Sequence, residues 1–292
     1  MDTQILSGKV VSESVYDNLK PRIDKLLSNS IMPGLAVVLV GDDAPSQVYV
    51  KNKTKKFLSL GLFSETIRLN NDVSQEDLIG VVNNLNNDNR YHGILVQLPL
   101  PNHISNETII NAISPNKDVD GFHPVNFGHL SAGKPTFIPC TPKGIMRVFK
   151  HYNINLSNKH VVVVGRSNIV GRPISILTSL KRNDSNATTT ICHSGTKNIS
   201  YYTKQADIVI LALGYPGFLK GNDIKEGAVV IDVGINRVKS TSGKGYMLLG
   251  DCDGSSIIGH ASALTPVPGG IGPMTIAMLV ENTIEAAEME LQ

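Results

Sequence analysis

Tyr49 and Lys53 stand four residues apart in Ser46–Leu60, a stretch with helical periodicity, so they share one face of the predicted helix. A lysine that is buried against apolar walls has a lowered pKa, which lets its amine exchange protons near neutral pH. We therefore predict that Lys53 is a proton-transfer group acting together with Tyr49. The alternative is a solvated basic face, because the stretch also contains Lys51, Lys55 and Lys56.

Gln97 lies near the end of the apolar run Gly93–Leu98, which is predicted to be a strand followed by Pro99 and Pro101. Parallel α/β sheets place ligands beyond the carboxyl ends of their strands, so Gln97 could hold Lys53 in place there. The alternative is an edge residue whose amide is satisfied locally.

The segment Lys117–Phe122 is a turn that carries two carboxylates, Asp118 and Asp120. Such an Asp-x-Asp-Gly run is often turn chemistry alone. A carboxylate on a rigid loop can also accept two hydrogen bonds from the amino-pyrimidinone edge of a pterin. The residues by themselves leave this choice open.

The segment Val161–Pro173 reads as a buried strand, a turn from Gly165 to Gly171 and the start of a helix, which is the place for a dinucleotide phosphate. Gly165 permits a tight turn and Gly171 a close packing of helix on strand. The two glycines are six residues apart, so the pattern is not G-x-G-x-x-G, and a plain glycine turn is the alternative.

NADP is favoured over NAD because the second strand of this unit, Thr188–Cys192, runs into His193 and Ser194 without the acidic residue that holds the ribose 2′-hydroxyl in NAD sites. Arg166 could pair with the 2′-phosphate through its planar guanidinium, and Ser194 could add a hydroxyl donor. Otherwise Arg166 is a solvated turn residue.

Strands and helices alternate along the chain, which predicts an α/β fold with two parallel sheets. The predicted strands of the first series are Leu35–Val40, Thr66–Leu69 and Gly93–Leu98, with helices at Ser46–Leu60 and Ser74–Asn86. Those of the second series are His160–Val164, Thr188–Cys192, Ile208–Ala212 and Ala228–Val233, with helices near Pro173–Lys181 and Ile199–Gln205. We expect a helix over Lys143–Tyr152 to link two domains that flank a cleft, and a last helix over Met274–Met289.

The chain has 292 residues, of which 41% are hydrophobic and 18% charged, and this composition is typical of a globular protein with two cores. A formal charge of +2 and the lack of a basic stripe argue against nucleic acid as a partner. The three cysteines are far apart and the histidines lack ligand spacing, so we expect a reducing compartment and no catalytic metal. We find no signal peptide or membrane span in the sequence and expect a cytoplasmic protein.

Six motifs, in order along nearly the whole chain, resemble the bifunctional methylenetetrahydrofolate dehydrogenase/methenyltetrahydrofolate cyclohydrolase family. They span Tyr49–Lys53, Gly93–Pro101, Pro115–Phe122, Pro139–Gly144, Gly165–Gly171 and Thr265–Thr275. The resemblance implies NADP-dependent oxidation of 5,10-methylenetetrahydrofolate, followed by hydrolysis of the methenyl product to 10-formyltetrahydrofolate in the same cleft. It also implies a homodimer and a last helix that returns to the first domain.

The resemblance assigns roles to individual residues. It implies that Lys53 is the essential lysine, Gln97 its hydrogen-bonding partner, Tyr49 the ring that stacks on the substrate and Asp120 the pterin anchor, with Asp118 as loop support. The cofactor contacts that it implies are Gly165, Arg166, Ser167, Ser194 and Ile235. Pro266, Gly269 and Gly270 match the backbone segment that approaches the folate, and Cys252–Ser256 depart from the family pattern.

The implied domains are 1–142 plus 274–292 for folate binding and catalysis, and a Rossmann-like domain, 143–273, for NADP. Three alternatives remain at this point. A short-chain dehydrogenase uses the same Tyr-x-x-x-Lys spacing, but its pair follows the glycine turn, whereas Tyr49 precedes Gly165 by more than a hundred residues. An amino-acid or shikimate-type dehydrogenase and a non-catalytic NADP-binding regulator are the other two.

Overall fold

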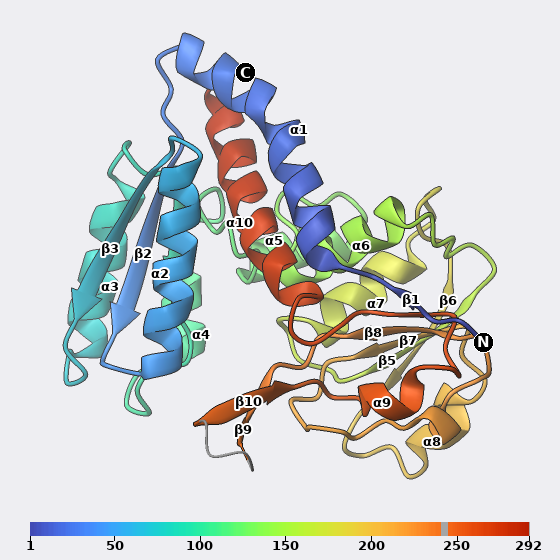
Figure 1. Cartoon of the computed structure of the whole chain (residues 1–292). Helices are drawn as coiled ribbons and strands as arrows, with labels where there is room; N and C mark the ends of the chain where they lie inside the picture. Colours follow the sequence, from blue (N-terminus) through green and yellow to red (C-terminus); the bar gives the residue numbers. More distant parts are fainter. Residues whose placement is uncertain (241–244, 292) are drawn as a thin grey trace. The chain divides into compact units, whose positions relative to one another are not determined.

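The computed structural model describes residues 1–240 and 245–291 and divides into two compact units. The first unit comprises Met1–Val15 and Thr141–Thr275, and the second comprises Tyr16–Cys140 and Ile276–Gln292. Each unit contains its own parallel sheet flanked by helices (Figure 1). The predicted α/β class with two domains is therefore confirmed.

The smaller sheet has three parallel strands in the order β3-β2-β4. They are β2 (Gly34–Val40), β3 (Phe63–Leu69) and β4 (Gly93–Val96). Every residue of β2 is buried, because helices cover both faces of the central strand. Helices α3 (Gln75–Asn86) and α4 (Asn106–Ala112) pack on the face that Ala36 and Val38 share, and α2 (Ala44–Ser59) covers the other (Figure 1).

The larger sheet has six parallel strands in the order β1-β11-β8-β7-β5-β6. Its four longer strands are those that the sequence predicts, within one residue at each end: β5 (His160–Val164), β6 (Thr188–Cys192), β7 (Ile208–Leu211) and β8 (Val229–Asp232). Strands β1 (Gln4–Ile5) and β11 (Ala263–Leu264) extend the sheet. They were not predicted, because two residues give no recognisable alternation.

The helices of this unit connect the strands as crossovers. They are α7 (Gly171–Ser179), α8 (Ile199–Thr203), the 3₁₀ turn η1 (Gly221–Asp223) and α9 (Gly254–Ile257). The atypical stretch after Cys252 is the start of α9, where the Asp253 side chain accepts a hydrogen bond from the Ser256 N–H. A hairpin of β9 (Asn236–Lys239) and β10 (Tyr246–Leu249), which the sequence analysis missed, projects from this unit (Figure 1).

Three long helices contribute residues to both units: α1 (Gly8–Ser28), α6 (Cys140–His151) and α10 (Ile271–Glu288), which continues into η2 (Met289–Leu291). Helices α6 and α10 were predicted, although each begins three residues earlier than expected. Helix α1 was not, because Pro21 in its interior and its many charged residues hide the helical pattern. The short helix α5 (Pro124–Ser131) was also missed.

Two predicted strand limits are wrong by two residues or more. Strand β3 begins at Phe63 rather than Thr66, because its half-buried polar residues pair with β2 despite their weak alternation. Strand β4 ends at Val96, two residues before a cis Leu98–Pro99 peptide bond, so Gln97 directly follows the strand.

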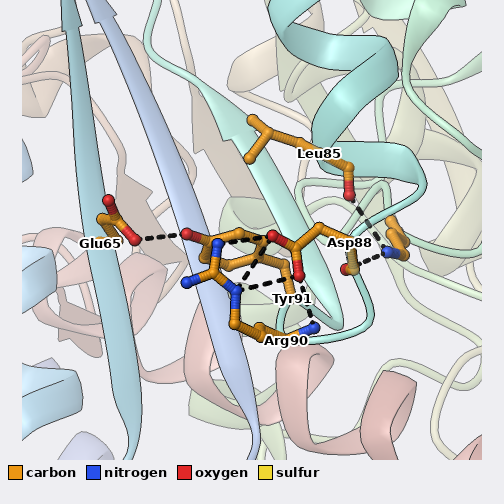
Figure 2. Close-up of polar contacts among 6 residues, drawn as sticks. Glu65, Leu85, Asp88, Arg90 and Tyr91 are labelled. Carbon is orange, nitrogen blue, oxygen red and sulfur yellow. Dashed lines mark hydrogen bonds and ion pairs between the residues drawn. The ribbon is translucent and has the colours of Figure 1, made fainter.

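The turn between α3 and β4 is held by a polar cluster (Figure 2). The Arg90 guanidinium donates to both carboxylate oxygens of Asp88, with Nη2 2.7 Å from Oδ2, and the Tyr91 hydroxyl donates to Glu65 on β3. Lys117 Nζ donates to the carbonyl oxygens of Leu85 and Asp88 at 3.2 and 2.8 Å. The cluster thus fixes the start of the loop that carries Asp118 and Asp120.

Within residues 1–240 and 245–291, no helix combines the length and apolar character needed to cross a membrane. In the same residues, no group of three or more histidine, cysteine, aspartate or glutamate side chains is arranged to hold a metal ion.

Candidate active site

Lys53 is distinguished from its neighbouring lysines by burial. It lies on the inward face of α2 with Ser46, Val50 and Phe57, spaced at intervals of three and four residues, and is 8% exposed. By contrast, Lys51 and Lys55 are exposed, and Lys56 Nζ lies 4.3 Å above the Tyr16 ring. The helix phase therefore places one amine of the four inside the unit, so α2 is not a uniformly solvated basic face.

The predicted pairing of Lys53 with Gln97 is present. Lys53 Nζ donates to Gln97 Oε1 at 3.1 Å, and Gln97 Nε2 donates to the Leu98 carbonyl oxygen at 2.7 Å. The second bond fixes the amide so that its oxygen faces the amine. Gln97 can take this position because it follows β4 at the carboxyl edge of the sheet, although its catalytic role stays a prediction.

Asp120 lies in the electrostatic field of Lys53. Burial raises the pKa of the Asp120 carboxyl, while the Lys53 charge and a hydrogen bond with Cys140 act in the opposite direction. The structure therefore brings together three of the predicted site residues, Lys53, Gln97 and Asp120, in one unit. An amine, an amide and a carboxylate so placed can bind a polar heterocycle and move protons.

The Asp120 loop is supported from within by Asp118, which is 1% exposed. Its carboxylate accepts hydrogen bonds from the backbone N–H groups of Phe122 and His123 at 3.2 and 2.8 Å, and from Asn126 Nδ2 at 2.8 Å. Burial is the main cause that raises the pKa of Asp118 to about 6, against these bonds. Asp118 is thus loop support, as the resemblance implied.

The same loop is held from outside by Asn282 on α10, a residue that sequence reasoning missed. Asn282 Nδ2 donates to the carbonyl oxygens of Val119 at 2.7 Å and Ile138 at 3.0 Å. Its side chain is fully buried. The available signal was an asparagine within an apolar helix, because a buried amide needs partners of its own.

Tyr49 lies one turn before Lys53 on α2 and is 44% exposed. A ring that is half accessible on the same side of a helix as the buried amine can stack on a planar substrate. This stacking role stays a prediction.

The turn after β5 is shaped by two glycines. Gly165 has φ +132°, and a Cβ atom there would lie 2.3 Å from the Ala212 carbonyl oxygen. A Cβ atom on Gly171 would lie 2.2 Å from the Gly165 carbonyl oxygen. Both positions therefore require glycine, because any larger residue would open the turn between β5 and α7.

The next residues of this turn prepare the start of α7. Ser167 Oγ accepts hydrogen bonds from the N–H groups of Val170 and Gly171 at 3.1 and 3.4 Å. Arg166 is exposed at the tip of the turn, and Ser194 is exposed just beyond β6. Because Val164 and Cys192 are paired neighbours in the sheet, Arg166 and Ser194 extend from the same sheet edge.

The residues at this edge fit NADP. The turn from Gly165 to Gly171 leads to the N-terminus of α7, a position where backbone N–H groups can stabilise phosphate oxygens. A hollow of about 380 Å³ opens beyond β6 and β7. It is lined by Thr196, Lys197, Asn198, Ile199, Ser200, Phe218, Leu219 and Asp223.

The remaining predicted residues belong to the unit with the six-stranded sheet. Ile235 follows β8 and is 38% exposed, and its contact with the cofactor stays a prediction. Pro266, Gly269 and Gly270 follow β11, and Gly269 has φ +104°. A Cβ atom on Gly270 would lie 2.5 Å from the Pro266 carbonyl oxygen, so this backbone is tightly folded. Its approach to folate stays a prediction.

The chain matches both domain models of one protein family. Residues 6–120 match the family model "Tetrahydrofolate dehydrogenase/cyclohydrolase, catalytic domain", and residues 139–291 match the model of the NAD(P)-binding domain of the same family. The bifunctional protein FolD of Streptococcus agalactiae is 51% identical over 286 residues, which cover 98% of both chains.

Two solved structures are similar over almost the full length. The bifunctional FolD methylenetetrahydrofolate dehydrogenase/cyclohydrolase of Campylobacter jejuni is 45% identical with a TM-score of 0.93, covering 99% of each chain. The Trypanosoma brucei enzyme, complexed with NADP cofactor and inhibitor, is 35% identical with a TM-score of 0.94, covering 100% of this chain and 99% of that one. This chain therefore belongs to the tetrahydrofolate dehydrogenase/cyclohydrolase family.

Proposed function

We propose that this chain performs both reactions of its family. It oxidises 5,10-methylenetetrahydrofolate to 5,10-methenyltetrahydrofolate with NADP, and it then hydrolyses the methenyl compound to 10-formyltetrahydrofolate. The observation that carries the proposal is the buried Lys53 amine, hydrogen-bonded to Gln97 in the field of Asp120. The family models and the NADP complex of the Trypanosoma brucei relative support it.

The oxidation requires chiefly alignment, because the folate nitrogens already make the methylene carbon a good hydride donor. NADP, when bound, supplies the hydride acceptor. The Gly165–Gly171 turn would hold its pyrophosphate through backbone N–H groups, and Arg166 and Ser194 would bind the 2′-phosphate. Ser167 keeps the start of α7 in shape, and Ile235 would contact the cofactor through its exposed side chain.

The hydrolysis requires proton movement by the protein itself. Water adds to the methenyl carbon with formation of a C–O bond, and one C–N bond then breaks. The water oxygen loses both of its protons as it becomes the formyl carbonyl: one reaches the departing nitrogen and the other is released to solvent. Lys53 would carry these protons, because its amine is held by Gln97 away from bulk solvent. Asp120 would accept hydrogen bonds from the pterin edge, and Tyr49 would stack on the ring.

The division of labour that we propose follows the sequence: residues 1–142 and 274–292 act on folate, and residues 143–273 bind NADP. In the structure, however, Met1–Val15 belong to the unit of the six-stranded sheet, because β1 pairs with β11. Pro266, Gly269 and Gly270 would contribute backbone to the folate site.

A homodimer and a cytoplasmic location are parts of the same proposal. Among the described strands, β3 pairs with β2 alone, so its outer edge presents seven residues of backbone that a second copy could pair with. The three cysteines are buried and form no disulfide within the described residues, and this fits a reducing compartment. Light scattering after size exclusion would test the dimer. A monomeric mass at micromolar concentration would rule it out.

The decisive experiment is an absorbance assay at 340 nm with NADP and 5,10-methylenetetrahydrofolate, followed by an assay of methenyl hydrolysis without any nucleotide. We expect NADPH to form only when the folate is present, and the methenyl chromophore to disappear faster than in buffer. NADP binding without either turnover would indicate a regulator instead. Turnover of shikimate or an amino acid, with none of the folate, would indicate the other dehydrogenase class.

A further inference from the structure

We call the carboxyl edge of the six-stranded sheet, where NADP is proposed to bind, the cofactor edge. Asp251 lies near this edge, and its carboxylate accepts four hydrogen bonds. Its Oδ2 accepts from the N–H groups of Leu213 and Gly214 at 2.7 and 3.0 Å. Its Oδ1 accepts from the N–H of Tyr215 at 2.9 Å and from Asn236 Nδ2 at 3.0 Å. A carboxylate offers about four acceptor positions, so one side chain fixes three consecutive residues after β7 and the residue that begins β9.

Asp232, the last residue of β8, holds Asp251 in turn. Its Oδ1 accepts from the N–H groups of Gly234 and Asp251, both at 2.9 Å, and its Oδ2 accepts from the Cys252 N–H at 2.8 Å. Burial raises the pKa of Asp232, and the backbone bonds counteract that effect. The two carboxylates thus form a hydrogen-bonded network, which we call the Asp232–Asp251 relay. It connects the end of β8 to the segment after β10, and that segment to the loop after β7.

The backbone around the relay leaves no room for side chains. A Cβ atom on Gly234 would lie 2.2 Å from Asp251 Oδ1, and one on Gly250 would lie 2.0 Å from Asp232 Oδ2. Asp251 is fully buried and Asp232 is 1% exposed. Neither carboxylate can therefore touch a ligand, and any effect on ligand binding must pass through the backbone that they hold.

The held segments all lie at the ligand edge of the six-stranded sheet. Leu213–Tyr215 follow β7, and Gly234–Asn236 follow β8, its neighbour in the sheet. Ile235, the proposed cofactor contact, stands between two residues that donate to the relay, Gly234 and Asn236. Parallel sheets bind dinucleotides at this carboxyl edge.

We propose that Asp232 and Asp251 are positioning residues of the NADP site: by binding seven backbone and side-chain donors, they fix the two loops against which the cofactor lies. This inference rests on the proposed function, because it takes NADP as the ligand of this edge. It adds a dependence of cofactor affinity on two carboxylates that do not contact the cofactor.

The test compares Asp251→Asn with Asp253→Asn in the full-length protein. The amide at position 251 would turn an NH₂ group toward backbone donors and leave at least one buried N–H without an acceptor. Asp253 is a matched control, since it caps α9, where asparagine caps as well as aspartate. The measurements are the Kd of NADP by titration, the KM values of both dehydrogenase substrates, and the rate of methenyl hydrolysis without nucleotide.

We expect Asp251→Asn to raise the Kd and KM of NADP at least about tenfold, as for the loss of one charge-assisted hydrogen bond. The folate KM and the nucleotide-independent hydrolysis should stay within about twofold, because Lys53, Gln97 and Asp120 lie in the other unit and, among the described residues, Asp251 does not hydrogen-bond to Pro266, Gly269 or Gly270. Asp253→Asn should change neither. An unchanged Kd of NADP in folded Asp251→Asn would overturn the proposal, as would a parallel loss of hydrolysis, which indicates a role in global stability.

If Asp251→Asn fails to fold, Asn236→Ala decides, because it removes one donor and leaves the carboxylate in place. We expect a two- to fivefold rise in the Kd of NADP, roughly the effect of one hydrogen bond, and no rise would overturn the proposal. Wild-type protein without folate turnover would instead contradict the proposed function, and the NADP titration can still be performed in that case.

Discussion

The Lys53 site and the cofactor edge use ionisable groups in opposite ways. At the Lys53 site, three polar side chains interact with one another: an amine on α2, an amide that follows β4 and a carboxylate on a loop. At the cofactor edge, the buried carboxylates of Asp232 and Asp251 point away from solvent and bind backbone N–H groups. The side chains of Arg166, Ser194 and Ile235, the predicted cofactor contacts, are exposed at this edge.

This difference follows from what each region has to do. Moving a proton requires a group of suitable acidity within reach of the reacting atom, so the side chain must be the active part. Holding a dinucleotide requires a fixed array of N–H groups, so the backbone is the active part and side chains serve it. Asp118 shows that the same device also supports the reaction site, because it holds the loop of Asp120 through two N–H groups.

The largest effect that separates the two regions is expected from Lys53→Met. This change keeps most of the volume and removes the amine, so methenyl hydrolysis should fall by about 10³-fold, the contribution typical of a positioned acid–base group. Folate binding should weaken far less. The measurement is steady-state hydrolysis together with a binding titration. Lys55→Met, at an exposed position of the same helix, should leave both unchanged, and unimpaired hydrolysis in Lys53→Met would remove Lys53 from the mechanism.

In the glycine turn after β5, where the backbone is the active part, we expect an added methyl group to destabilise the fold. Gly165→Ala places a Cβ atom 2.3 Å from the Ala212 carbonyl oxygen at φ +132°, and we expect a loss of roughly 3 kcal/mol in the free energy of unfolding. Urea denaturation measures it. Gly61→Ala has φ +72° with no atom within 4 Å of the new Cβ, so it should cost only about 1 kcal/mol. Equal costs would show that the clash with Ala212 does not matter.

The Asp118 carboxyl predicts a specific pH dependence. Its pKa in the folded chain is raised to about 6, above the ordinary value of about 3.9. Its contribution to stability is therefore fully present below pH 4 and is lost as the pH rises through 6. Wild type should lose about 2 to 3 kcal/mol relative to Asp118→Asn between pH 4 and pH 7. Urea titrations across this range measure the difference, and a constant difference would contradict the raised pKa.

The smallest of these effects is expected at the exposed tip of the cofactor turn. Arg166→Ala should raise the KM of NADP by about 30-fold, as for the loss of a charge-assisted bond to phosphate. The KM of NAD should change little, since NAD lacks the 2′-phosphate. Lys181→Ala, another exposed cation of the same unit, should alter neither value. A change in Arg166→Ala of the same size for both nucleotides would assign Arg166 to the pyrophosphate instead.

The sequence was a good guide to the central strands and to the residues that end them. The strands β5 to β8 and β2 show runs of β-branched residues that few other structures accommodate, so their positions could be predicted. Gly165 and Gly171 were recognisable because a tight turn between strand and helix needs residues without side chains. The two-residue strands β1 and β11 were missed, because pairing partners distant in the sequence stabilise them. The β9–β10 hairpin pairs neighbouring segments and was missed because each of its strands has only four residues.

The residue types of the reaction site were determined by the sequence, since an amine, an amide and two carboxylates stand in motifs that can be recognised along one chain. Which of the four lysines in α2 is buried was decided by the packing of that helix on its sheet. The supporting groups, Asn282 on the last helix and the Asp232–Asp251 relay, follow only from tertiary structure. The physical reason is that a hydrogen bond joins groups by distance in space, and more than a hundred residues separate Asn282 from the loop that it holds.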